Sequence, residues 1–140
     1  DGAGVIDQVC DVVDRAHLGQ RVWTWNAQWQ RPMGTAAEYV VLPQAQTVRL
    51  PDNTDFAAGA CFGIPALTAL QAMVWAERLT GDLRGKRVLV VGAASSVGHY
   101  ITQLAHQAGA DVLGTVGSDD RAAHAQAVGL HMPPHSPHPT

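Results

Sequence analysis

The chain has 140 residues, of which 46% are hydrophobic and 15% charged, and its formal net charge is −3. This balance lacks the basic stripe of a nucleic-acid-binding protein, and no apolar run approaches the ~18–20 residues that a membrane span requires. Two cysteines and an N-terminus without a signal-peptide pattern favour a reduced, cytoplasmic setting. Because the sequence begins at Asp1 rather than at methionine, we expect a fragment or a trimmed product.

Residues 1–50 are predicted to be rich in β-structure. Short apolar or alternating runs are separated there by turn signals at residues 19–20 and 32–34. Strands this short favour a small barrel or sandwich. The predicted strands cover residues 5–6, 9–13, 21–25 and 38–42.

Residues 51–85 are predicted to form two connecting helices. Polar residues that can cap a helix precede an alanine-rich run, which Gly63 and Pro65 should end. The second helix is predicted to begin at Pro65, since proline is tolerated in a first turn, and to end before Gly81.

Residues 86–130 alternate in the β-α-β manner. The apolar run 88–91 is continuous, which is expected for a strand with both sheet faces covered. Apolar residues at helical spacing follow, and Gly109 is suited to end their helix. The predicted elements are a strand at 88–91, a helix at 97–108, a strand at 111–116 and a helix at 119–128. The remaining segment, 131–140, holds four prolines and is predicted to be disordered or polyproline-like.

The turn between the first strand and the first helix of this region has the character of a dinucleotide site. Such a site needs a sharp turn, a close approach of the backbone to pyrophosphate, and a helix N-terminus aimed at the charge. The turn contains nothing larger than valine, and Ser95 stands where glycine is usual. The residues predicted to bind pyrophosphate are Gly92, Ala93, Ser95, Ser96, Val97 and Gly98. The alternative is a tight strand-helix turn that binds nothing.

The end of the second strand discriminates between cofactors. NAD enzymes usually place Asp or Glu there to hold the ribose hydroxyl, whereas this chain has Ser118, with Arg121 one helical turn further on. A hydroxyl and a guanidinium suit a 2′-phosphate, so the sequence favours NADP over NAD. The alternative is that Ser118 only caps a helix and Arg121 is a solvated surface charge.

Several segments besides this turn follow one another in a characteristic order. They are residues 19–23, 37–39, 50–51, 57–60, 66–69 and 88–98. Together they resemble the zinc-independent quinone oxidoreductases, the zeta-crystallin-like branch of the medium-chain dehydrogenase/reductase superfamily. The chain departs from this family in being much shorter, and in having Cys10 and Asp11 where the family usually has glycine and a small or acidic residue in a turn.

The resemblance implies an α/β fold made of a partial GroES-like β-barrel and a partial Rossmann domain, which is a doubly wound parallel nucleotide-binding domain. Residues 1–50 would belong to the GroES-like catalytic domain, 51–85 to connecting helices and 86–130 to the first half of the Rossmann domain. It also implies NADPH-dependent hydride transfer to a quinone or an α,β-unsaturated carbonyl compound, without a metal. An intact parent enzyme would be expected to form a homo-oligomer.

The same resemblance places Thr68 near the nicotinamide, although an ordinary mid-helix threonine is an equal alternative. It assigns no catalytic side chain. A second hypothesis is a non-catalytic remnant that at most binds a dinucleotide. Half a sheet would leave an unpaired edge and bare apolar faces, so this hypothesis predicts poor solubility or dimerisation unless another chain completes the sheet.

A third hypothesis is a fragment of a zinc-dependent alcohol dehydrogenase, in which Cys61 would be a metal ligand. A second cysteine or histidine ligand is not recognisable, so Cys61 is interpreted as a buried apolar cysteine. Trp23, Trp25 and Trp29 either shape a pocket for a flat acceptor, or belong to the barrel core, or lie on a surface bared by truncation.

Overall fold

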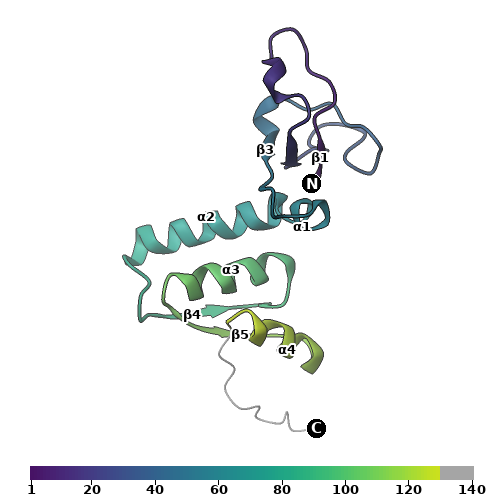
Figure 1. Cartoon of the computed structure of the whole chain (residues 1–140). Helices are drawn as coiled ribbons and strands as arrows, with labels where there is room; N and C mark the ends of the chain where they lie inside the picture. The colour runs from purple at the N-terminus through teal and green to yellow at the C-terminus, as the bar shows by residue number, and fades with distance from the viewer. Residues whose placement is uncertain (130–140) are drawn as a thin grey trace. The chain divides into compact units, whose positions relative to one another are not determined.

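The computed structural model describes residues 1–129, which divide into two compact units, Asp1–Ile64 and a second that begins at Pro65 (Figure 1). Both helices and strands are present, so the predicted α/β class is confirmed. The segment 131–140 lies outside the described residues, and the prediction made for it is therefore not tested.

The first unit is built on a three-stranded antiparallel sheet. Its strands are β1 (Gly2–Val5), β2 (Arg21–Thr24) and β3 (Thr47–Arg49), in the order β1-β2-β3. Trp23 lies opposite Ala3 on one side and Val48 on the other. The central strand β2 confirms the strand predicted at residues 21–25. Strand β1 overlaps the strand predicted at residues 5–6 only at its last residue, Val5.

Two predicted strands of this unit are wrong. Residues 9–13 form a turn closed by a hydrogen bond from the Val13 N–H to the Cys10 carbonyl, and Val12 is 92% exposed. Residues 38–42 are irregular, and Val41 is 91% exposed. Both runs have strand-like side chains, but neither pairs with an edge of the sheet β1-β2-β3. A strand needs an edge to pair with, and β-propensity alone does not supply one.

Two helices follow β3 along the chain. The short α1 (Phe56–Ala60) begins at Asp55, whose carboxylate accepts a hydrogen bond from the Ala58 N–H at 2.7 Å. The long α2 (Gly63–Thr80) begins two residues before the predicted start, so Gly63 opens this helix. At its C-terminal end Gly81 has a positive φ of 77°, which is the conformation expected of a C-terminal glycine cap.

The second unit contains the predicted β-α-β-α succession. Its elements are β4 (Arg87–Val90), α3 (Ser96–Gln107), β5 (Asp111–Gly114) and α4 (Asp119–Ala127). The two strands are parallel, with Val88 opposite Val112. All four elements confirm the predicted types, and their ends differ from the predicted ones by at most two residues.

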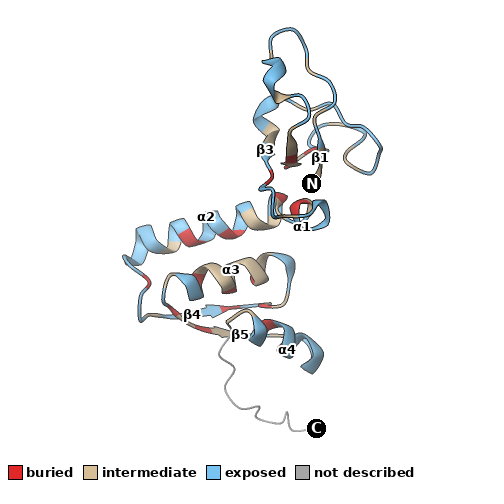
Figure 2. Cartoon of the chain, viewed as in Figure 1, coloured by how far each residue is buried: buried red, intermediate tan, exposed pale blue. Residues whose placement is uncertain are grey.

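The core of the second unit is made largely of small residues. Ala93, Ala105 and Ala125 are fully buried, and Val112 is 1% exposed (Figure 2). Alanines at these positions let two helices and a parallel strand pair approach closely. The expectation that β4 is covered on both faces is wrong for the described residues. Leu89 is 65% exposed, because α3 and α4 contribute to only one buried cluster and nothing else in residues 1–129 covers the second face.

Candidate functional site

The turn from β4 into α3 has a backbone that depends on two glycines. Gly92 has a φ of 73°, in the left-handed region that glycine adopts without strain, and its carbonyl accepts a hydrogen bond from the Ser95 N–H at 2.8 Å. Gly98 packs directly on this turn. A Cβ at Gly98 would overlap the Gly92 carbonyl oxygen and lie 3.0 Å from Cα of Ala93. The spacing read from the sequence therefore corresponds to a real close approach of helix to strand.

Thr115, just beyond β5, holds the turn in place. Its hydroxyl oxygen accepts from the Gly92 N–H at 3.0 Å, and its carbonyl accepts from the Ala93 N–H at 2.9 Å. Its own N–H donates to the Val90 carbonyl. Thr115 was not among the predicted site residues. The available signal in the sequence was a hydroxyl residue directly after β5, the strand that pairs with β4.

Ser95 caps α3 at its N-terminus. Its hydroxyl oxygen accepts a hydrogen bond from the Gly98 N–H at 3.1 Å. The sequence predicted Ser95 as a pyrophosphate-binding residue and did not indicate this capping contact. The capping contact uses a lone pair and leaves the hydroxyl proton available as a donor.

The turn leaves a small set of backbone N–H groups open. Gly92, Ala93 and Ser95 donate within the protein, as described above. Among residues 1–129, the N–H groups of Ala94, Ser96 and Val97 have no hydrogen-bond acceptor. First-turn N–H groups of a helix are unpaired by geometry and carry the positive end of its dipole. The open donors of the turn are therefore suited to an anion, and Ala94 was not in the predicted set.

The other predicted site residues lie on the surface of the second unit. Ser118 is the N-cap residue of α4, yet its side chain makes no capping hydrogen bond. Arg121 is exposed and has no ion-pair partner among residues 1–129. Thr68 is exposed on α2. The hydroxyl of Ser118 and the guanidinium of Arg121 are thus both accessible to a ligand.

The structure also brings together two histidines from different helices. His99 of α3 stacks on His124 of α4, with ring centroids 5.0 Å apart and planes 18° apart. The Nδ1 atom of His99 is buried without a partner in the described part of the chain. Burial, and secondly the charge of His124, lower the pKa of His99 below its ordinary value of 6.5. The neutral ring is therefore the form that suits this helix contact.

The three tryptophans of the first unit do not form one pocket. Trp23 packs edge-on against Phe62, with ring centroids 5.9 Å apart, and the indole N–H of Trp25 donates to the Ala45 carbonyl. Trp29 alone lines a hollow, and it is 65% exposed. The hollow includes no residue of the glycine turn. Its lining residues are Asp1, Asn26, Ala27, Gln28, Trp29, Arg31 and Ile64.

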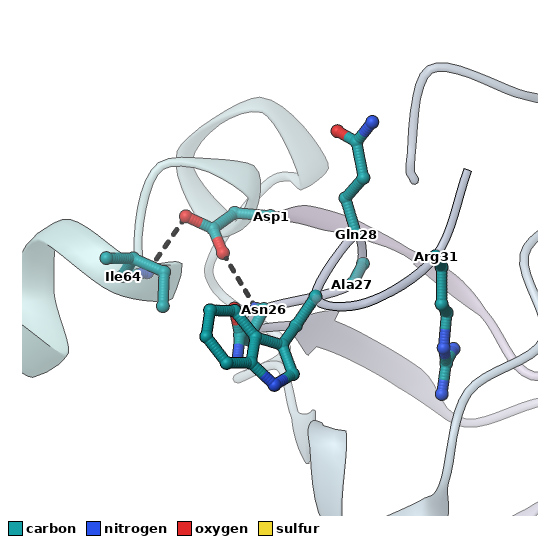
Figure 3. Close-up of a pocket in the computed structure, with 7 residues that line it drawn as sticks. Asp1, Asn26, Ala27, Gln28, Arg31 and Ile64 are labelled. Carbon is teal, nitrogen blue, oxygen red and sulfur yellow. Dashed lines mark hydrogen bonds between the residues drawn. The ribbon is translucent and has the colours of Figure 1, made fainter. Parts of the chain in front are cut away.

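Asp1, which lines this hollow, has a structural role. Its carboxylate accepts hydrogen bonds from the Asn26 N–H at 3.1 Å and from the Ile64 N–H at 2.8 Å (Figure 3). The second bond satisfies an N–H in the first turn of α2. The carboxylate therefore ties the chain start to a loop and to a helix N-terminus.

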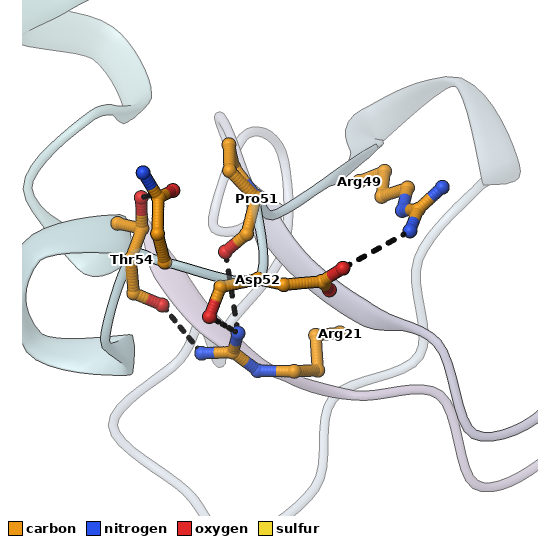
Figure 4. Close-up of polar contacts among 6 residues, drawn as sticks. Arg21, Arg49, Pro51, Asp52 and Thr54 are labelled. Atoms are coloured by element: carbon orange, nitrogen blue, oxygen red, sulfur yellow. Dashed lines mark hydrogen bonds and ion pairs between the residues drawn. The ribbon is translucent and has the colours of Figure 1, made fainter.

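Arg21 organises the segment that precedes α1. Its guanidinium donates to the carbonyls of Pro51, Asp52 and Thr54, at 3.2, 3.1 and 2.5 Å (Figure 4). It also lies 4.7 Å from the ring centroid of Phe56. These contacts explain why an arginine of β2 fixes residues about thirty positions away.

Two further predictions concern metals and membranes. Cys61 is exposed, so its interpretation as a buried apolar cysteine is wrong; it occupies the C-cap of the five-residue α1, where the chain faces solvent. Within residues 1–129, no group of three or more metal-ligating side chains comes together. None of the helices in this part of the chain is long and apolar enough to cross a membrane.

Comparison with known proteins finds several quinone oxidoreductases among the similar proteins. No protein-family model matches the chain. It is 37% identical over 120 residues to the quinone oxidoreductase of Rattus norvegicus, covering 86% of this chain and 34% of that relative. The structure of a Pseudomonas syringae quinone oxidoreductase has a TM-score of 0.74 at 36% identity, covering 92% of this chain and 38% of the other.

A second solved structure carries a cofactor. The quinone oxidoreductase of Thermus thermophilus, determined alone and in complex with NADPH, has a TM-score of 0.68 at 28% identity, covering 81% of this chain and 36% of the other. The chain spans about a third of the length of the relatives it matches.

Proposed function

We propose that this chain, which is homologous to quinone oxidoreductases over most of its length, provides the pyrophosphate-binding turn of an NADPH-dependent oxidoreductase. The proposed reaction is hydride transfer to a quinone or to an α,β-unsaturated carbonyl compound. The observation that carries the proposal is the turn from β4 to α3. Its open N–H groups at Ala94, Ser96 and Val97 stand at a helix N-terminus, where anions bind favourably.

The geometry of the turn supports the proposed pyrophosphate site. Gly98 allows α3 to approach β4 closely, and hydrogen bonds to Thr115 hold the backbone N–H groups of Gly92 and Ala93. Ser95 and Ser96 are both exposed, and each presents a hydroxyl that can donate to a phosphate oxygen. A preorganised set of donors lowers the entropic cost of binding.

Ser118 and Arg121 form the part of the proposed site that would distinguish NADPH from NADH. The hydroxyl of Ser118 is not engaged in capping, and Arg121 follows it on the first turn of α4. A guanidinium can form charge-assisted hydrogen bonds with the 2′-phosphate of NADPH, which NADH lacks. By resemblance to the family, Thr68 is proposed to lie near the nicotinamide. The cofactor, when bound, would supply the hydride, and the residues of this chain would hold and orient it.

A fluorescence titration with NADPH and with NADH tests the proposal. The chain is expected to bind NADPH more tightly, and Arg121→Gln should weaken NADPH binding by about tenfold or more, the loss of one charge-assisted contact, while leaving NADH binding unchanged. Arg15→Gln is the matched control, because it removes the same charge from an exposed arginine of the other unit. If the folded chain binds neither dinucleotide, the proposal fails. If it prefers NADH, the assignment of NADP fails.

A second candidate function is dinucleotide binding without reduction. It is favoured because the residues assigned above all belong to the proposed dinucleotide site and none is assigned a catalytic role. Oxidation of NADPH in the presence of a quinone distinguishes the two. Turnover by the purified chain supports the oxidoreductase, and binding without turnover supports the second candidate.

A further inference from the structure

Thr115 makes two kinds of contact with the turn between β4 and α3. Its N–H donates to the Val90 carbonyl at 3.0 Å, and its carbonyl accepts from the Ala93 N–H at 2.9 Å. These two are backbone contacts, which most other residues at position 115 would make as well. The third contact is the hydroxyl oxygen, which accepts from the Gly92 N–H at 3.0 Å. Only this hydrogen bond depends on the side chain of residue 115.

The hydroxyl of Thr115 begins a succession of three hydrogen bonds that reaches the first turn of α3. The first joins Thr115 to the Gly92 N–H. The carbonyl of Gly92 then accepts from the Ser95 N–H at 2.8 Å, and the Ser95 hydroxyl accepts from the Gly98 N–H at 3.1 Å. Gly92 is thus held at both its N–H and its carbonyl. Glycine adopts positive and negative φ about equally well, so its φ of 73° is maintained by such contacts.

We propose that Thr115 is a positioning residue for dinucleotide binding, an inference that rests on the function proposed above. Its hydroxyl holds Gly92 in the left-handed conformation, and Gly92 in turn holds Ser95 and the start of α3. The open N–H groups of Ala94, Ser96 and Val97 are thereby fixed before the pyrophosphate arrives, which lowers the entropic cost of binding.

This role differs from the one proposed for Arg121. Thr115 acts on the turn that would bind the pyrophosphate, which NADPH and NADH share, whereas Arg121 would contact the 2′-phosphate, which only NADPH has. Loss of the Thr115 hydroxyl should therefore weaken the binding of both dinucleotides by the same factor. The ratio of the two dissociation constants should stay at its wild-type value.

Fluorescence titrations of the folded chain with NADPH and with NADH test this role in two variants of Thr115. Thr115→Val keeps the branched shape and removes the hydroxyl, whereas Thr115→Ser keeps the hydroxyl and removes the methyl group. Thr115→Val should raise both dissociation constants by about three- to tenfold, the effect of one hydrogen bond, and Thr115→Ser should restore wild-type affinity. Because Thr115 is exposed, the fold should survive, which circular dichroism checks.

Thr80→Val is the matched control. The Thr80 hydroxyl donates to the Ala76 carbonyl at 2.8 Å within α2, so this variant also loses one hydroxyl hydrogen bond in the second unit. None of the contacts of this hydroxyl involves the glycine turn. Both dissociation constants of Thr80→Val should therefore equal those of the wild type.

Hydrogen exchange measured by NMR gives a readout that needs no ligand. The Gly92 amide should exchange at least about fivefold faster in Thr115→Val than in the wild type, and Thr115→Ser should restore its protection. Thr80→Val should leave the exchange of this amide unchanged. An unchanged Gly92 amide in Thr115→Val would show that the hydroxyl does not hold the turn, and would overturn the inference.

The remaining outcomes separate this inference from the proposed function. Wild-type binding that Thr115→Val leaves unchanged overturns the inference alone. So does a loss confined to NADPH, or a loss that Thr115→Ser does not restore. A folded wild-type chain that binds neither dinucleotide overturns the proposed function, and the inference with it. Equal losses for the two dinucleotides in Thr115→Val, restored in Thr115→Ser and absent in Thr80→Val, support the positioning role.

Discussion

Gly98 is the position at which the glycine turn is most sensitive to one added methyl group. A Cβ there would overlap the Gly92 carbonyl oxygen, lie 2.9 Å from its carbonyl carbon and lie 3.0 Å from Cα of Ala93. All three neighbours are backbone atoms and cannot yield by changing rotamer. Overpacking of this kind costs about 1–3 kcal/mol, and the upper end applies here. Alanine is better than glycine within a helix by about 1 kcal/mol, which offsets part of the cost.

The net expectation for Gly98→Ala is a loss of about 2 kcal/mol in the free energy of unfolding. For a unit of this size, that loss corresponds to a fall of roughly 10 °C or more in Tm. Urea and thermal denaturation followed by circular dichroism measure both quantities. Dinucleotide affinity should fall as well, because the open N–H groups of Ser96 and Val97 move with the displaced helix.

Gly117→Ala is the matched control. A Cβ at Gly117 meets nothing within 4 Å, and its φ is not in the left-handed region. Its stability should therefore stay within about 0.5 kcal/mol of the wild type. If Gly98→Ala is as stable as Gly117→Ala, the close approach of α3 to β4 does not exist in solution, and the reasoning about the turn is refuted.

Two further predictions concern contacts that the structure shows directly. Burial and the charge of His124 lower the pKa of His99 in the folded state, so near this pKa the unfolded chain binds more protons than the folded one. The contribution of His99 to the free energy of unfolding is therefore present above pH 6.5 and is lost as the pH falls below it. His99→Gln should flatten that part of the stability–pH curve measured by urea denaturation, and an unchanged slope would contradict the assignment. Arg21→Lys should lose about 1–2 kcal/mol in the same assay, because lysine cannot reproduce the forked contacts or the stacking over Phe56. Arg49→Lys is the control: it changes an arginine in an exposed ion pair and should alter the free energy of unfolding by less than about 0.5 kcal/mol. Equal losses in the two variants would contradict the stabilising role given to the Arg21 guanidinium contacts.

The second unit was predictable because its elements are defined by neighbours close in sequence. The apolar spacing of α3, the glycine that ends it and the apolar run of β4 are all local signals. The glycine turn could be identified for the same reason: Gly92 and Gly98 meet across six residues. The first unit was predicted less well. The strand candidates at 9–13 and 38–42 have the right composition, but β2 pairs with residues 2–5 and 47–49 instead.

Residues that act through distant partners were the ones that sequence reasoning missed. Thr115 anchors the glycine turn from 23 residues away. His99 meets His124 only because α3 and α4 share one buried cluster. No periodicity within either helix predicts that contact, since it depends on how two helices pack.

The sequence by itself determined the β-α-β succession, the glycine turn and the resemblance to quinone oxidoreductases, because each is recorded in short-range spacing of residue types. Only the tertiary structure decided which N–H groups of the turn remain open, since Thr115 and Ser95 consume three of the others. It also decided that Leu89 is exposed among residues 1–129. A continuous apolar run is compatible with cover on one face or on two, and only the arrangement of the packed elements distinguishes these cases.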